Sequence, residues 1–123
     1  MAVLALIELS SDFITPPSND GLRLCERVLN LGLKAKPEVG IQFGAGGATS
    51  AAELETEGTH DAAWMIQLAR RFLDAGAYQI MIESEGITEN VRQWRTDVPA
   101  RIIDALGWEH VMFEAADPAV WGW

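Results

Sequence analysis

The stretch RFLDAGAYQIMIESEGI, residues 71–87, holds the end of a helix, a glycine stop and a short buried strand. The helical pattern ends at Gly76, since a residue without a Cβ can close a helix. The run from Tyr78 to Ile82 lacks the alternation of a half-solvated strand, which is typical of a strand buried in a parallel sheet. Glu83 follows directly. This order predicts one unit of a parallel α/β fold that delivers an acidic residue at the end of its strand.

Three more runs of this kind occur, and helical patterns lie between them. The strands are predicted at Val3 to Leu9, Leu33 to Val39, Tyr78 to Ile82 and Val111 to Phe113. The first two helices are predicted within residues 19–33 and 59–77, the second with Thr59 as its N-cap. The third connection is predicted to hold two helices, one over residues 89–94 capped by Thr88 and one capped by Asp97, with Pro99 in its first turn and Gly107 at its end. Strand and helix alternate, which gives right-handed crossovers and a parallel sheet.

The spacing of the strands indicates part of a (βα)8 TIM barrel. About 30 residues separate the strands at the first and third steps, and the second step is longer because a glycine-rich insertion intervenes. A doubly wound sheet fits nearly as well. Eight barrel units occupy roughly 250 residues, so residues 1–123 are predicted to form a single partial TIM-barrel domain of about four consecutive βα units.

The composition excludes several classes of partner. The chain carries 9 Lys and Arg against 18 Asp and Glu, a net charge of −9. Nucleic acid and anionic membranes need a basic surface, so neither is an expected partner. The single Cys25 excludes an internal disulfide, and the apolar start lacks a basic segment and a cleavage site. The interpretation is a cytoplasmic protein with no membrane span.

Each predicted strand ends close to a glutamate, and these four are Glu8, Glu38, Glu83 and Glu114. In parallel α/β folds chemistry collects at the carboxyl ends of the strands. Strand parity places the four on one mixed face, interpreted as the barrel lumen, whereas the opposite face is nearly all apolar. Four ionised carboxylates at the same end of a barrel repel one another unless a cation lies between them. A ligand set made of oxygen atoms alone favours Mg2+. The simpler alternative is that each glutamate is a solvated strand end or the partner of a nearby arginine.

Two other features could serve a site. Lys36 shares the parity of Glu38, so it is interpreted as a lumen cation that neutralises Glu38; a solvated lysine at the strand edge is the alternative. The segment FGAGGATSAAELETEG, residues 43–58, contains Gly44, Gly46 and Gly47, whose backbone N–H groups could hold a phosphate. It lacks the Walker A and dinucleotide patterns. A plain surface loop is an equally good explanation.

Four stretches together resemble one enzyme family. IELSSDFITPP, KPEVGIQ, RFLDAGAYQIMIESEGI and VMFEAADP follow in one collinear order and are similar to the phosphosulfolactate synthase family, the ComA-type (βα)8 enzymes. The resemblance implies the fourth to seventh strands of that barrel. It also implies the activity of the family, the Mg2+-dependent addition of sulfite to phosphoenolpyruvate in coenzyme M biosynthesis.

The chain departs from this family at positions where the synthases carry basic residues. Ile41 and Gln42 follow the Glu-Val-Gly motif in place of lysines, Glu85 replaces an arginine, and Pro118 replaces a lysine. Because both family substrates are anions, these changes remove electrostatic stabilisation from the mouth. Arg92 and Arg95, which follow the third strand, are the replacements expected to bind substrate, together with Lys36.

Two functions are compatible with these features. The first is a Mg2+-dependent lyase-type enzyme acting on a small anionic phosphorylated or carboxylated acid, with the glutamates as metal ligands and Lys36 and Glu38 as catalytic residues. The second is a non-catalytic barrel that binds a protein partner, for which Trp121 and Trp123 could mark a surface. A four-stranded sheet with two open edges is also expected to form a homo-oligomer.

Overall fold

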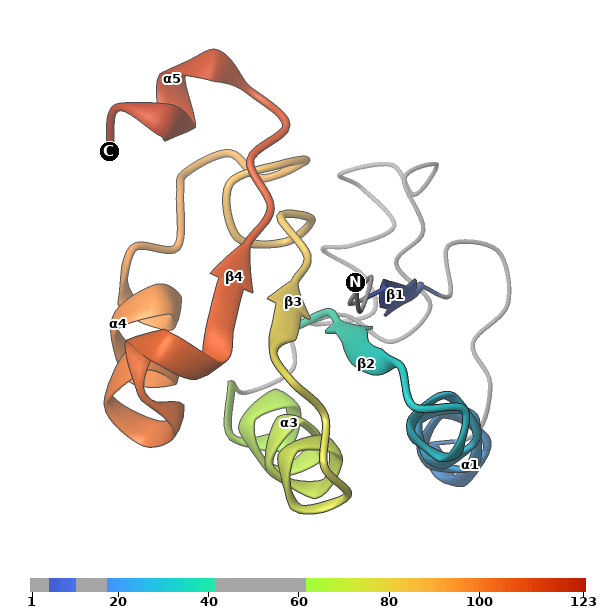
Figure 1. Cartoon of the computed structure of the whole chain (residues 1–123). Helices are drawn as coiled ribbons and strands as arrows, with labels where there is room; N and C mark the ends of the chain where they lie inside the picture. Colours follow the sequence, from blue (N-terminus) through green and yellow to red (C-terminus); the bar gives the residue numbers. More distant parts are fainter. Residues whose placement is uncertain (1–4, 11–17, 42–61) are drawn as a thin grey trace.

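The computed structural model describes residues 5–10, 18–41 and 62–123, and these form a parallel α/β unit (Figure 1). The strands are β1 (Leu6–Leu9), β2 (Lys34–Val39), β3 (Ile80–Ile82) and β4 (Val111–Phe113). The helices are α1 (Ser18–Asn30), α3 (Ala62–Asp74), α4 (Asp97–Leu106) and α5 (Pro118–Trp121), with a 3-10 turn η1 (Trp108–His110) before β4. All four predicted strands are confirmed, although β2 begins one residue and β3 two residues later than expected, and Ala5 lies before β1 instead of within it. None of the described helices is long and apolar enough to cross a membrane.

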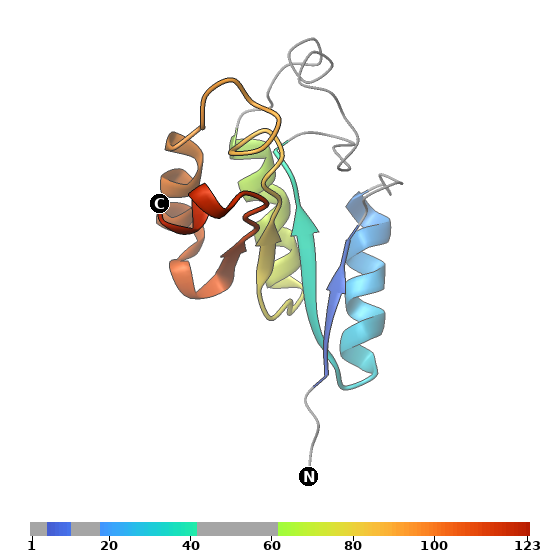
Figure 2. The ribbon, with the colours of Figure 1, turned by 90° about the horizontal axis from the view of Figure 1, so that it is seen from above.

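The strands form one sheet in the order β1-β2-β3-β4, and every neighbouring pair is parallel (Figure 2). The register pairs Glu8 with Lys36, Glu38 with Met81, and Ile82 with Phe113. Sequential neighbours joined by helices are the arrangement of consecutive units in a TIM barrel.

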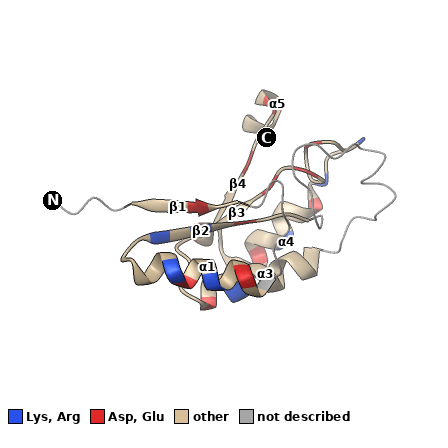
Figure 3. Ribbon diagram, turned by 90° about the vertical axis from the view of Figure 1, so that its right-hand side faces the viewer, with Lys and Arg blue, Asp and Glu red and all other residues tan. Residues whose placement is uncertain are grey.

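The helices α1, α3 and α4 cover one face of this sheet, as the edge-on view in Figure 3 shows. A doubly wound fold would place helices on both faces, so the arrangement favours the barrel. The core between these helices and the sheet includes Ala35, Val39, Ile80, Ile82 and Val111 from the strands. Helix positions Cys25, Met65, Phe72, Val98 and Ile102 complete it. The predicted parity is confirmed, because the apolar strand positions face the helices and the charged positions face away.

Glycines with positive φ end the two helices that precede β2 and β3. Gly32 has φ 75°, and Gly76 has φ 99° with its N–H bonded to the carbonyl of Leu73. In this region of backbone space a side chain is strained, and a Cβ on Gly76 would lie 3.1 Å from a methyl carbon of Leu29 on α1. Each glycine therefore turns the chain directly from a helix into the next strand.

Two predictions for the third connection are wrong. Residues 89–94 do not form a helix: the carbonyl of Ser84 accepts the N–H groups of Ile87, Thr88 and Glu89, which closes a compact turn directly before them, and residues 90–95 continue without regular structure. The N-cap of α4 is Thr96 rather than Asp97, and its side chain makes no capping bond. Asp97 is the first helical residue, and its carboxylate binds Arg95. The predicted Thr59 cap and the whole glycine-rich segment, residues 43–58, lie outside the described residues.

Candidate functional site

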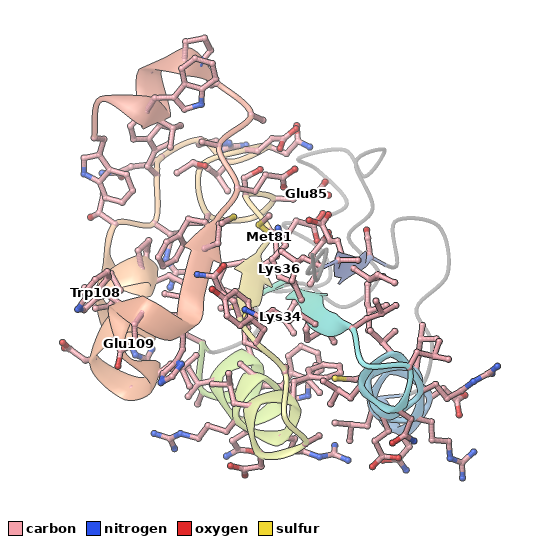
Figure 4. All side chains as sticks on the ribbon, in the orientation of Figure 1. Lys34, Lys36, Met81, Glu85, Trp108 and Glu109 are labelled. Carbon is pink, nitrogen blue, oxygen red and sulfur yellow. The ribbon has the colours of Figure 1, made fainter. Side chains whose placement is uncertain are left out.

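The face of the sheet away from the helices carries an ion pair between neighbouring strands. Lys36 Nζ on β2 lies 2.9 Å from Glu8 Oε2 on β1. The same Nζ lies 3.7 Å from Met112 Sδ on β4, so the lysine reaches across β3 (Figure 4). Side chains of the first, second and fourth strands can meet in this way only if the sheet curves toward this face. The face is therefore concave, as the lumen side of a barrel is.

This geometry decides between the two interpretations of Lys36. The residue is buried, which excludes a solvated lysine at the strand edge. The sequence predicted that it neutralises Glu38 on its own strand, whereas the structure pairs it with Glu8 on the next strand. The difference arises from the register, which places Glu8 directly beside Lys36.

Three consecutive polar residues are buried where β3 ends. Glu83, Ser84 and Glu85 are 9%, 2% and 1% exposed. Ser84 donates to carboxylate oxygens from two elements: its Oγ lies 2.7 Å from Glu89 Oε2 and 3.3 Å from Glu114 Oε2, and its backbone N lies 3.3 Å from the same Glu114 oxygen. Buried polar groups are held by hydrogen bonds in this manner. Ser84 thus ties the end of β3 to the carboxylate that follows β4.

The turn after β3 is rigidly specified by its own polar groups. Asn90 Nδ2 donates to Glu85 Oε1 at 3.0 Å, and Asn90 has φ 53°, in the left-handed region that asparagine tolerates. Arg95 N donates to the carbonyl of buried Ile87 at 2.8 Å, which anchors the far end of the turn. In the sequence Glu85 stands out only as a departure from a family, and Ser84 does not stand out. The signal that could have identified both is a triplet of polar residues directly after a buried strand.

An open cavity of about 510 Å3 lies beside this turn, at the carboxyl ends of β3 and β4. Glu83, Ser84 and Glu114 form part of its wall, and Ile103 of α4 and Phe113 of β4 contribute apolar surface. Two of the four predicted glutamates therefore share one cavity. Concave sites with a few convergent polar groups are where ligands bind.

The four glutamates lie at different levels along the strands and do not form one ring. On β2, Glu38 lies two residues beyond Lys36, which is the register partner of Glu8. Glu83 and Glu114 come directly after Ile82 and Phe113, the last paired residues of β3 and β4. Such a stagger accompanies the strand tilt of a barrel. Within the described ranges, no three His, Cys, Asp or Glu side chains lie close enough together to hold one metal ion. The arrangement fits a site that uses one or two carboxylates better than a four-carboxylate cage.

Every basic residue of the chain can be located, because all nine fall in the described ranges. Six lie on the helices or at the start of β2: Arg23, Arg27, Lys34, Arg70, Arg71 and Arg101. Of the remaining three, Lys36 pairs with Glu8, and Arg95 holds Asp97 through bonds of 3.0 and 2.9 Å. The Arg95 hydrogen bond holds the pKa of Asp97 below its ordinary value. Arg92 is exposed in the same connection.

The other predicted binding residues are not placed. Gly44, Gly46 and Gly47 lie outside the described residues. Cys25 of α1 is buried in the core, and burial raises the pKa of its thiol. A raised pKa keeps the thiol protonated and unreactive.

Comparison with known proteins identifies one family and one relative. The family model of (2R)-phospho-3-sulfolactate synthase (ComA) matches residues 3–123. The protein HEAT-STRESS-ASSOCIATED 32 of Arabidopsis thaliana is 31% identical over 127 residues. That alignment covers 95% of this chain and 44% of the relative, so the chain spans less than half the length of this relative. No solved structure matches the chain.

Proposed function

Because the chain belongs to the phosphosulfolactate synthase (ComA) family, we propose that it supplies part of a Mg2+-dependent, lyase-type active site for a small carboxylated or phosphorylated acid. Its strands would be the fourth to seventh of the family barrel. The observation that carries the proposal is the buried polar group at the ends of β3 and β4, where Ser84 orients Glu114 next to Glu83. Burying several polar groups in one concave place is the arrangement expected of a functional site.

The carboxylates of Glu83 and Glu114 are the groups that would hold the cation. Mg2+ commonly keeps several waters and binds proteins through one or two carboxylates, with the substrate completing its shell. Two carboxylates on one cavity wall fit that pattern, and Ser84 restrains one of them through its N–H and its hydroxyl. When bound, such an ion stabilises negative charge on a substrate oxygen. Glu8 and Glu38 lie deeper on the same face and could bind only through water.

Lys36 would donate the proton, and Glu38 on the same face of β2 would assist it. The ammonium group is buried and oriented by Glu8 at 2.9 Å, so it is presented to the lumen in one position. A positioned ammonium can act as a general acid toward a carbanion or an enolate. Met112 Sδ lies 3.7 Å from the same nitrogen and is its neighbour on the other side.

The distribution of positive charge favours one small anion over two. Lys36 and Arg95 are both in ion pairs with carboxylates, and Arg92, which is exposed in the connection after β3, is the main candidate for contact with a substrate phosphate or carboxylate. Bringing two anions together needs positive charge aimed at both. The charges therefore support an enolate reaction of a single acid better than the sulfite addition of the family. The sulfite addition is still the first reaction to test, because it is the reaction of the family.

The test is phosphorus NMR of the chain with phosphoenolpyruvate, with and without Mg2+ and sulfite. We expect loss of the phosphoenolpyruvate signal that requires Mg2+ and is reduced at least about tenfold in Glu83→Gln and Glu114→Gln. The matched control is Glu109→Gln, because Glu109 is an exposed glutamate on η1, away from the cavity. Turnover that is independent of Mg2+, or equal in all three variants, would contradict the proposal.

A non-catalytic role as a scaffold is the second candidate. Trp108, Trp121 and Trp123 are exposed, and exposed tryptophans are favoured at protein interfaces. The relative from Arabidopsis thaliana is named for heat stress and not for a reaction. Calorimetry separates the candidates: binding heat with Mg2+ or with phosphoenolpyruvate supports the enzyme, and no heat with either supports the scaffold.

A further inference from the structure

We infer that Ser84 is itself a ligand of the cation, through its Oγ, and that Glu89 positions this oxygen, an inference that rests on the proposed function. The proposed site already holds the carboxylates of Glu83 and Glu114. Ser84 Oγ adds a neutral oxygen to these two, and Glu89 acts on the ion only through Ser84. A serine or threonine hydroxyl is a common Mg2+ ligand, because this ion prefers hard oxygen donors.

The Ser84 hydroxyl has two carboxylate oxygens within reach but carries only one hydrogen. Its Oγ lies 2.7 Å from Glu89 Oε2 and 3.3 Å from Glu114 Oε2. A strong hydrogen bond from a hydroxyl to a carboxylate is about 2.5–2.7 Å long, so the shorter contact is the one that holds the hydrogen. On the side of Glu114 the Oγ therefore presents its lone pairs.

The contact between Ser84 Oγ and Glu114 Oε2 thus joins two electron-rich oxygens. At 3.3 Å with no hydrogen between them, such oxygens repel each other unless a positive charge lies beside both. An octahedral Mg2+ with bonds of about 2.0–2.1 Å holds neighbouring ligand oxygens roughly 2.9 Å apart. The observed spacing is only slightly larger, so a small rotation of the Glu114 side chain would let both oxygens bind one ion.

The backbone of Ser84 fixes this pair of oxygens before an ion arrives. Ser84 is 2% exposed, and its N–H donates to the same Glu114 oxygen at 3.3 Å. Among the residues that the structure describes, Ser84 alone holds the Glu114 side chain. The N–H bond keeps Glu114 beside Ser84 whichever way the hydroxyl points, so the direction of the hydroxyl hydrogen decides whether the Oγ can bind a cation.

Glu89 sets that direction from the turn after β3. The backbone N–H of Glu89 is bonded to the carbonyl of Ser84 at 3.1 Å, which brings its side chain back onto the Ser84 hydroxyl. Ser84 and Glu114 line the cavity, whereas Glu89 does not. Glu89 is therefore a positioning residue, of the kind that orients a metal ligand without touching the metal.

Calorimetric titration of the protein with Mg2+ and with Cd2+ tests the role of Ser84. Ser84→Ala removes the Oγ and keeps the N–H, and we expect the dissociation constant for Mg2+ to rise at least about fivefold. Ser84→Cys replaces the oxygen by sulfur, which soft metals favour and Mg2+ does not. This variant should bind Mg2+ more weakly than the wild type and Cd2+ at least about tenfold more tightly. The buried Cys25 is common to both proteins, so the comparison removes its contribution.

Glu89→Gln tests the positioning. The amide N–H of glutamine can donate to the Oγ and turn the hydroxyl hydrogen toward Glu114, so Mg2+ should bind at least about threefold more weakly. Glu109→Gln is the matched control, because it removes the same charge from an exposed glutamate outside the cavity wall. Circular dichroism verifies that each variant is folded.

The outcomes separate the ligand role of Ser84 from the proposed function. If Glu83→Gln and Glu114→Gln weaken Mg2+ binding while Ser84→Cys gains no affinity for Cd2+, Ser84 is only structural and the proposed function stands. Equal Mg2+ affinity in Glu89→Gln and Glu109→Gln would overturn the role of Glu89. A wild-type protein that binds neither ion saturably at millimolar concentration would overturn the proposed function itself.

Discussion

Replacing Glu8 should lower the free energy of unfolding more than replacing Lys36, because the Lys36 side chain is much more buried than that of Glu8. The Lys36 side chain is 10% exposed and the Glu8 side chain 45% exposed, at 2.9 Å from each other. In an effective dielectric of about 20 the attraction at that distance is roughly 6 kcal/mol before desolvation. Removing the lysine from water offsets most of that attraction, so the net contribution of the pair is much smaller.

In Glu8→Gln the buried ammonium has, among the described residues, a neutral amide in place of the carboxylate and the Met112 sulfur as its neighbours. An incompletely satisfied buried charge costs roughly 1–3 kcal/mol, and the partial exposure of the site favours the lower half of that range. In Lys36→Met the remaining carboxylate is nearly half exposed and is solvated by water, so the loss should stay below about 1 kcal/mol.

Urea unfolding at neutral pH measures both free energies, with the equal-length replacement Glu109→Gln as a control on an exposed glutamate. We expect the Glu8 variant to be the less stable of the two by about 1 kcal/mol. Equal losses, or a larger loss for Lys36→Met, would mean that the lysine is not held by Glu8 in the folded protein.

Three further outcomes follow from the described residues. Gly76→Ala should reduce the free energy of unfolding by about 1 kcal/mol or more, whereas Gly122→Ala, at φ −86° with open space around it, should be neutral in the same urea titration. Cys25 should react with a thiol reagent at pH 8 many times more slowly in the native than in the urea-unfolded chain, because burial raises the pKa of its thiol. Arg95→Gln should raise the pKa of Asp97 in an NMR titration, and the small stability that the pair gives should be present above the ordinary pKa of Asp97 and fade as the pH falls through the lowered one.

The strands and their two faces could be predicted because burial leaves a direct mark on the sequence. Strand parity placed Ile80 and Ile82 on the apolar face opposite the glutamates, and the structure buries both. Gly76 likewise marked the end of α3, since a positive φ there favours glycine over all other residues. These features depend on local patterns, which a single sequence contains.

The arrangement of the polar groups could not be predicted, because it depends on contacts between strands. The pairing of Lys36 with Glu8 follows from the register of β1 and β2. The segment 89–94 has a composition compatible with a helix, yet the Ser84 carbonyl, the buried Ile87 and the left-handed Asn90 together hold it as a turn. The role of Ser84 likewise requires Glu114 from the neighbouring strand.

Backbone NMR during a Mg2+ titration determines whether the ends of β3 and β4 form a cation site. We expect the amide signals of Ser84 and Glu114 to shift with a saturable dependence on Mg2+, the signal of Glu109 on η1 to stay in place, and Glu83→Gln to weaken the response. Uniform small changes along the chain, or no change at Ser84 and Glu114 at millimolar Mg2+, would contradict a cation site there.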